Sequence, residues 1–282
     1  MAPFPPTAQL PGLFTPEVLG TVTTAPLKSS LTQRAVEDPW RFDPLAVAHE
    51  VGECDLMISL TPWHSSSLDQ LLEILSPHQS LGFSVNFGIS LVPEVTRNIA
   101  DVFFQVPALI EPALQIEDFL GGPVVSARYR DKAHHICSQL PDRCRILAVH
   151  ADTFAPKMWS AESFAEVLGT FLGRHADFVA LLVGCPDASW ARTMSGERVV
   201  RCFPLDLPTS LGLVAEANLF LGVDSCMLHC ADLQLIPGVG LFGPTDPSRW
   251  GFRFARHRHV VGIGTMASIC PVEVLDALES LL

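Results

Sequence analysis

The sequence predicts an α/β fold with two Rossmann-like domains, of which the N-terminal one is truncated or degenerate. In the second half of the chain, short apolar runs alternate with segments of helical periodicity, a pattern typical of a doubly wound sheet. One run, residues 178–183, is apolar at every position, as expected for a parallel strand buried on both faces. The length of 282 residues, 48% of them hydrophobic, suffices for two modest cores.

The N-terminal part predicts only a reduced domain. Residues 1–50 are rich in Pro, Thr and Ser without sustained periodicity, and we expect an irregular lead-in. The run 55–60 suits a buried strand, and residues 65–75 place leucines at helical spacing. A second strand is expected at 80–85 and a helix at 107–120.

The boundary between the domains is expected in a linker between Gly121 and Asp142, part of which is helical around residues 127–140. Residues 51–140 would then form a reduced α/β domain with the linker, and residues 141–282 a second α/β domain.

The second half is more regular. A strand is predicted at 146–149, followed by a helix at 161–172 that Ser160 caps. Further strands are predicted at 199–202, 219–223 and 239–242, and further helices at 209–217, 225–233 and 271–282.

Charge and composition exclude several classes of protein. The formal charge is −12 with only 18 Lys and Arg, so a broad nucleic-acid-binding surface is not expected. No apolar run approaches the roughly 20 residues that span a bilayer, and no secretory signal is recognisable. We therefore expect a cytoplasmic protein with no transmembrane segment.

The eight cysteines lack the paired spacing of a zinc ribbon or a disulfide scaffold. Cys226, His229 and Cys230 would share one face of a helix, a geometry that suits a metal. Without an evident fourth ligand nearby, the favoured interpretation is that the two cysteines are buried small hydrophobes and that there is no metal site.

Three loops follow predicted strands, where ligands bind in doubly wound sheets. In the first, residues 150–159, Lys157 and Thr153 are suited to binding a phosphate, although a solvated loop explains them equally well. In the second, Asp224 and Ser225 are suited to a sugar hydroxyl and a phosphate, and the alternative is a simple helix cap.

His229 lies one turn further along and, taken alone, is more often a core histidine than a ligand contact. The third loop, residues 241–247, contains Gly243 and Thr245 and would line a pocket or form a tight turn.

Together the three loops resemble the C-terminal domain of the heptosyltransferase-like glycosyltransferases of family 9, which have the GT-B fold. The loops match the family's segments His-Ala-x-Thr-x-x-x-Lys-x-Trp, Val-Asp-Ser/Thr-Gly-x-x-His and Phe-Gly-Pro-Thr-Asp-Pro, in that order. Their spacing also fits, so the resemblance covers roughly the last 140 residues. The resemblance implies that residues 51–140 are the acceptor-side domain and residues 141–282 the nucleotide-sugar-binding domain.

The resemblance implies an inverting, metal-independent transferase that moves a heptose or hexose from a nucleotide diphosphate donor to an acceptor. ADP-heptose would be the co-substrate, with no other cofactor, and the acceptor would be lipopolysaccharide core or another glycan or metabolite. Thr153 and Lys157 would contact the donor phosphates, Asp224 the sugar and Ser225 a phosphate, while His229 would support the loop.

Of the remaining positions, Asp187 falls near the family's nucleoside-binding region, and Gly243 and Thr245 would complete the donor site. Two positions depart from the family. Cys226 stands where the family has glycine, and a side chain there would crowd a diphosphate. The family's N-terminal Gly-Asp loop, whose aspartate is taken as the general base, has no counterpart before Asp55.

An inverting transfer needs a base near the acceptor hydroxyl. His64, just after a predicted strand, is the candidate, and Asp38 or Asp43 are alternatives. The basic segment Arg253, Arg256, His257, Arg258 and His259 is expected to be a solvated loop, or else to steer an anionic ligand.

Two further hypotheses remain open at this point. The chain would be a catalytically inactive GT-B-like protein that binds a nucleotide sugar or a partner, or a sugar-nucleotide epimerase on a related fold. Transfer or hydrolysis of a donor distinguishes the transferase from the inactive protein.

Overall fold

The computed structural model describes residues 42–63, 65–121, 125–184, 189–202 and 205–282. These residues form two compact units, a smaller one that ends at Asp118 and a larger one that runs from Phe119 to Leu282. Each unit contains a parallel sheet with helices beside it, which confirms the α/β fold class. The domain boundary expected at residue 141 lies inside the larger unit.

The smaller unit has a three-stranded parallel sheet in the order β1-β2-β3. Its elements are α1 (Pro44–Val51), β1 (Leu56–Ser59), α2 (Ser66–Leu75), β2 (Gln79–Gly82), β3 (Ile89–Ser90), α3 (Ile99–Ile110) and a 3-10 turn (Ile116–Phe119). The strand and helix expected at 55–60 and 65–75 are confirmed. Met57, Leu71 and Phe87 form the small core that α1 and α2 cover.

The prediction of a helix at residues 107–120 is wrong, because the helix in this region spans Ile99–Ile110. Helix α3 begins after Asn98, whose Oδ1 accepts a hydrogen bond from the N–H of Ala100 at 3.0 Å. It ends at Ile110 because Glu111 precedes Pro112 and takes the extended backbone that a following proline favours. The residues up to 120 form a turn and a single 3-10 segment instead.

The larger unit has a six-stranded parallel sheet in the order β6-β5-β4-β7-β8-β9. The strands are β4 (Arg145–His150), β5 (Phe178–Leu182), β6 (Val199–Arg201), β7 (Leu219–Val223), β8 (Gly238–Phe242) and β9 (His257–Val261). Every residue of β5, β7 and β8 is buried, as the apolar runs predict. The order reverses at β4, which gives the predicted doubly wound topology.

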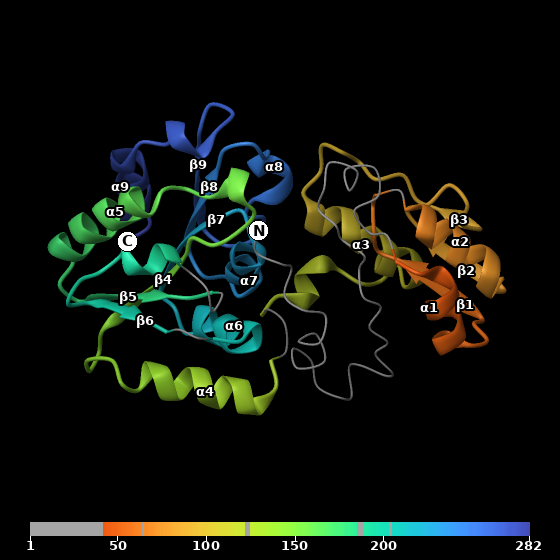
Figure 1. Ribbon diagram of the computed structural model, residues 1–282, viewed down its shortest axis with the longest axis horizontal. Helices are drawn as coiled ribbons and strands as arrows, with labels where there is room; N and C mark the ends of the chain where they lie inside the picture. The colour runs from red at the N-terminus through yellow and green to blue at the C-terminus, as the bar shows by residue number, and fades with distance from the viewer. Residues whose placement is uncertain (1–41, 64, 122–124, 185–188, 203–204) are drawn as a thin grey trace. The chain divides into compact units, whose positions relative to one another are not determined.

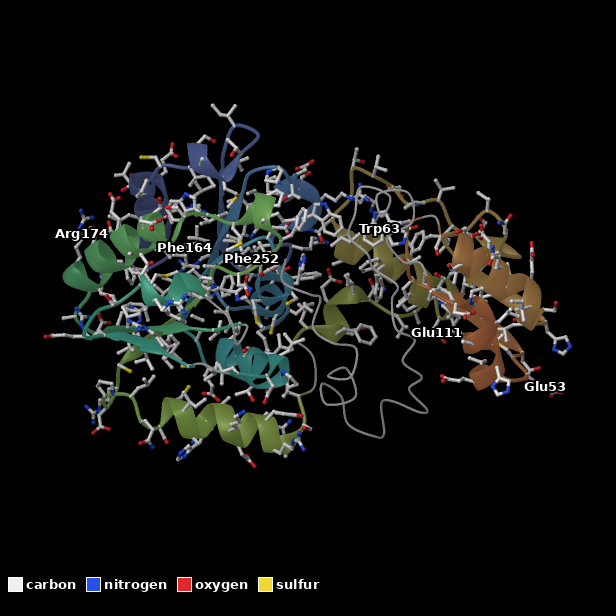
Figure 2. All side chains as sticks on the ribbon, in the orientation of Figure 1. Glu53, Trp63, Glu111, Phe164, Arg174 and Phe252 are labelled. Carbon is white, nitrogen blue, oxygen red and sulfur yellow. The ribbon has the colours of Figure 1, made fainter. Side chains whose placement is uncertain are left out.

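Helices cover both faces of this sheet, α5 and α9 on one face and α4, α6 and α7 on the other (Figure 1). The helices are α4 (Ala127–Cys137), α5 (Ala161–Arg174), α6 (Leu207–Ala215), α7 (Cys226–Leu233), α8 (Pro247–Trp250) and α9 (Pro271–Glu279). Figure 2 shows Phe164 and Phe252 inside the larger unit and Arg174 at its surface. Helix α4, expected within the linker, packs on this unit through Ala133.

Helix α5 follows the sequence prediction closely. Ser160 Oγ accepts a hydrogen bond from the N–H of Ser163 at 3.0 Å, which confirms the predicted N-cap. The apolar stripe of the helix is buried: Phe164, Val167, Leu168, Phe171 and Leu172.

The prediction of a solvated loop at the basic segment 253–259 is wrong, because residues 257–259 belong to the edge strand β9. His257 and His259 stack on each other with ring centroids 4.5 Å apart, and His257 stacks on Phe252. The guanidinium of Arg256 donates to the carbonyl of Leu281. In this strand the rings of His257 and His259 pack on one side while Arg258 points to solvent, as the alternation of side chains along a strand allows.

Across the residues that the structure describes, no helix combines the length and the apolar composition that a membrane crossing requires.

Candidate functional site

The three loops singled out in the sequence lie at one edge of the large sheet. They follow β4, β7 and β8, which are neighbours in the sheet order and run parallel. The carboxyl ends of these strands therefore meet at the same edge, where ligands bind in doubly wound folds. We call residues 150–159, 224–226 and 243–249, which include the first residues of α7 and α8, the carboxyl-edge site.

An ion pair joins the first two loops. Lys157 Nζ lies 2.8 Å from Asp224 Oδ2, and the Asp224 side chain is only 4% exposed while that of Lys157 is 27% exposed. Thr153 Oγ1 donates to the backbone carbonyl of Asp224 at 3.2 Å. The structure thus brings together Thr153, Lys157 and Asp224, and leaves the lysine side chain partly exposed to solvent.

Ser225 precedes α7 at the N-cap position, yet its side chain makes no capping bond. Its Oγ is buried and has no hydrogen-bond partner within the described residues. The first N–H groups of a helix carry partial positive charge and attract anions. Ser225 and the start of α7 are therefore able to donate to a phosphate oxygen beside Lys157.

His229 lies one turn into α7, close to the ion pair. Burial lowers the pKa of its imidazole below the ordinary value, an effect that Asp224 and Asp232 oppose and that Lys157 reinforces. Burial therefore favours the neutral form of the ring, which adds no positive charge to the site.

Gly243 is required by chain packing. A Cβ at this position would lie 2.5 Å from the backbone nitrogen of Met266, a distance that real side chains do not show. The glycine thus lets residues 265–266 approach the third loop. Thr245, two residues later, has a buried Oγ1 without a hydrogen-bond partner among the described residues.

Sequence reasoning missed two residues at this edge. His150, the last residue of β4, is buried, and its Nδ1 lies 2.9 Å from the carbonyl oxygen of Val183. Burial lowers the pKa of this imidazole, although the Val183 carbonyl opposes the shift. The second is Arg249, which lies in α8 two residues past the third loop and which no sequence pattern singled out. Its Nε is buried without a hydrogen-bond partner in the described part of the chain.

Other predicted residues lie elsewhere. His64, Asp187 and Asp38 fall outside the described residues. Asp43 caps α1 by accepting hydrogen bonds from two backbone N–H groups, so its carboxylate has a structural contact.

The two cysteines of the metal hypothesis differ in exposure, since Cys226 is exposed and Cys230 is buried. Within the described residues, no three His, Cys, Asp or Glu side chains form a group able to hold a metal.

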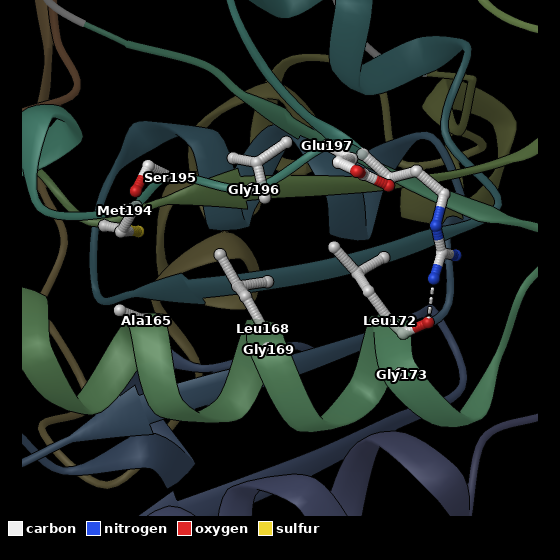
Figure 3. A pocket seen from close by; sticks show the side chains of 11 residues that line it. Ala165, Leu168, Gly169, Leu172, Gly173, Met194, Ser195, Gly196 and Glu197 are labelled. Atoms are coloured by element: carbon white, nitrogen blue, oxygen red, sulfur yellow. Dashed lines mark hydrogen bonds between the residues drawn. The ribbon is translucent and has the colours of Figure 1, made fainter.

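Two cavities of the larger unit lie next to helix α5. One of about 250 Å³ separates α5 from residues 194–199 and is lined by Gly169, Gly173 and Met194 (Figure 3). Arg198 crosses its end and donates to the carbonyl of Leu172. A second cavity, of about 600 Å³, is lined by Trp159 and Trp190 at the start of α5. The linings of both leave out Lys157 and Asp224.

Comparison with known proteins agrees with the arrangement of the loops. The model of glycosyltransferase family 9 (heptosyltransferase) matches residues 108–274. No match was found among curated protein sequences.

Solved structures share the fold. A family 9 glycosyl transferase from Veillonella parvula DSM 2008 matches with a TM-score of 0.69 and 19% identity over 84% of this chain and 77% of that one. The E. coli heptosyltransferase WaaC with ADP matches with a TM-score of 0.62 and 15% identity over 91% and 83%. E. coli ADP-heptose lps heptosyltransferase II matches with a TM-score of 0.61 and 14% identity over 84% of this chain and 78% of that one.

The family match covers more than half of the chain, including all three carboxyl-edge loops, and the structural similarity extends over both units. The chain therefore belongs to glycosyltransferase family 9 and is a glycosyltransferase of the GT-B fold.

Proposed function

We propose that this glycosyltransferase moves a heptose from ADP-heptose to a sugar hydroxyl of a lipopolysaccharide-type glycan, with inversion and without a metal. The observation that carries the proposal is the contact of Lys157 and Asp224 beside the uncapped start of α7. Support also comes from WaaC, a structurally similar heptosyltransferase solved with ADP and with ADP-2-deoxy-2-fluoro heptose.

Each residue has a chemical task in this proposal. The Lys157 ammonium and the Ser225 hydroxyl bind the donor diphosphate, together with the N–H groups at the start of α7. The Asp224 carboxylate accepts hydrogen bonds from hydroxyls of the transferred sugar. Thr153 holds the backbone of Asp224, so that the first two loops keep their spacing.

The proposed transfer needs only the donor, the acceptor and a general base. The acceptor hydroxyl oxygen attacks the anomeric carbon from the face opposite the diphosphate, and its proton passes to a general base. The bond between the anomeric carbon and the diphosphate oxygen breaks, and ADP leaves with the electron pair. We propose His64 as the base and Asp187 as a contact of the nucleoside, both from their places in the sequence.

An assay of nucleotide release tests this proposal. Purified protein is incubated with ADP-heptose, ADP-glucose or UDP-glucose, each with and without heptose-deficient lipopolysaccharide core and in the presence of EDTA. We expect ADP release from ADP-heptose that requires the acceptor and persists in EDTA. ADP binding without release under any condition would favour the catalytically inactive alternative, and the exposed Cys226 at the start of α7 would then be replaced by glycine to restore transfer.

His64→Ala separates the base from the donor site. We expect this variant to lose most of its kcat while its affinity for ADP stays that of the wild type. An unchanged kcat would show that another group takes the proton.

A further inference from the structure

The carboxyl-edge site has a shortage of positive charge. The ammonium of Lys157 lies within ion-pair distance of the Asp224 carboxylate, so the pair is close to neutral as a whole. The diphosphate of a nucleotide sugar is a polyanion, and its desolvation in a half-buried site requires compensating charge. The helix start contributes only a partial charge.

Helix α8, which directly follows the third loop, supplies a second cation. Within the residues of the carboxyl-edge site, the Lys and Arg side chains are those of Lys157 and Arg249. Arg249 lies in α8, directly after the loop that contains Thr245, and its guanidinium carbon is 5.4 Å from the centre of the Trp250 ring. Among the described residues Arg249 forms no ion pair within 4.0 Å. The pKa of the exposed Asp246 is lowered mainly by hydrogen bonds from Ser248, and the positive charge of Arg249 contributes less.

Three buried donor atoms of the carboxyl-edge site have no hydrogen-bond partner within the described residues: Ser225 Oγ, Thr245 Oγ1 and Arg249 Nε. A buried donor without a partner costs free energy, commonly about 1–3 kcal/mol, so such groups are rare unless a ligand or water completes them. Three such atoms in adjacent loops, which follow the paired strands β7 and β8, indicate one ligand that completes them together.

We infer that Arg249 is a second binding residue for the donor diphosphate, supplying through its guanidinium the charge that the Lys157–Asp224 pair does not. The planar guanidinium donates two parallel hydrogen bonds to a phosphate, and Trp250 restricts where it points. Thr245 Oγ1 donates beside it. The inference rests on the proposed function, since it assigns a further residue to the same donor.

Binding of ADP and AMP to purified variants tests this inference. Arg249→Gln is compared with Arg258→Gln, which removes an equally charged but exposed side chain on β9. We expect Arg249→Gln to weaken ADP binding about tenfold, as the loss of a charge-assisted hydrogen bond does, and to affect AMP less. Arg258→Gln should bind both nucleotides as the wild type does.

The dependence on salt separates charge from structure. If Arg249 contacts the diphosphate, the ADP affinity of Arg249→Gln falls less steeply with ionic strength than that of the wild type, and Arg249→Lys recovers part of the affinity. A thermal melt of each variant reports any loss of folding. A lower melting temperature with wild-type ADP affinity and salt dependence would overturn the inference and leave Arg249 a structural residue.

The failure of this inference differs from the failure of the proposed function. Wild-type protein that binds ADP, with Lys157→Met weakened and Arg249→Gln unchanged, would refute the role of Arg249 alone. Wild-type protein that binds neither ADP, UDP nor inorganic diphosphate would refute both.

Discussion

The ammonium of Lys157 lies 2.8 Å from a carboxylate oxygen of Asp224, and the two residues belong to loops that follow neighbouring strands of one sheet. The pair fixes the spacing of the first two carboxyl-edge loops. It also gives the almost fully buried Asp224 carboxylate an ammonium partner beside the start of α7. Under the proposed function, this contact therefore couples the stability of the protein to donor binding.

Removal of one partner of this pair should cost more than removal of both. In Lys157→Met, Asp224 keeps a buried charge without its partner, and we expect a loss of about 1–3 kcal/mol in the free energy of unfolding. The double variant Lys157→Met/Asp224→Asn should lose less than the single variant. Urea denaturation of the double variant and of the two single variants, Lys157→Met and Asp224→Asn, measures the difference. Additive losses in the two single variants would contradict a direct interaction.

An exposed ion pair provides the matched control. Arg97 and Glu94 lie 3.2 Å apart with both side chains about half exposed. Arg97→Met should change the free energy of unfolding by less than about 1 kcal/mol.

Two glycines should respond in opposite directions to alanine. Gly243→Ala places a Cβ 2.5 Å from backbone atoms of Met266 and should destabilise the protein and disturb the third loop. Gly169→Ala adds a Cβ in the interior of α5 with nothing within 4 Å, and should stabilise the fold by about 0.5–1 kcal/mol. Melting temperatures decide between the two effects. A destabilised Gly169→Ala would show that the cavity in Figure 3 requires glycine.

A partly buried histidine, His259, should make stability depend on pH. Burial, reinforced by His257, lowers the pKa of His259 to about 4, and its Nε2 accepts a hydrogen bond from the N–H of Phe252. The ordinary histidine pKa is about 6.5, so the unfolded chain takes up a proton at a pH where the folded chain does not. Stability is therefore present above pH 6.5 and is lost as the pH falls from 6.5 towards 4.

His259→Gln should reduce this dependence. We expect its free energy of unfolding to fall less than that of the wild type between pH 7 and pH 5, by about 1–2 kcal/mol. His78→Gln, which changes an exposed side chain, serves as the control. Parallel curves for wild type and His259→Gln would contradict the assignment.

Asp232 provides a test of structure that leaves the donor site alone. Its carboxylate is buried and accepts hydrogen bonds from the N–H groups of Arg253, Phe254 and Ala255 at 2.8–2.9 Å. Asp232→Ala leaves these three donors without an acceptor and should lower the free energy of unfolding by about 2–4 kcal/mol. Its ADP affinity, measured below the unfolding transition, should stay within about twofold of the wild type. A larger loss of affinity would place this carboxylate in the donor site.

The larger sheet was predictable because its strands are buried on both faces and therefore read as continuous apolar runs. Residues 178–183 and 219–223 show this directly. Strand β9 was missed because this edge strand contains His257, Arg258 and His259, a composition that resembles a loop, and the packing of the two histidine rings is not visible in the sequence. The start of α3 was missed because its cap, Asn98, precedes an apolar run that continues through Pro107.

The site was predictable as three loops but not as a set of contacts. Lys157 and Asp224 are far apart in the sequence, and only the order of β4 and β7 in the sheet brings them together. For Arg249, a missing hydrogen-bond partner is a property of packing, which a sequence pattern does not contain.

Calorimetric titration of ADP into Lys157→Met/Asp224→Asn tests the central claim most directly. The double variant removes both charges of the pair without changing their sum, so neither net charge nor a lone buried ion accounts for an altered affinity. We expect ADP to bind at least about tenfold more weakly than to the wild type. Wild-type affinity in the folded double variant would contradict donor binding at the carboxyl-edge site.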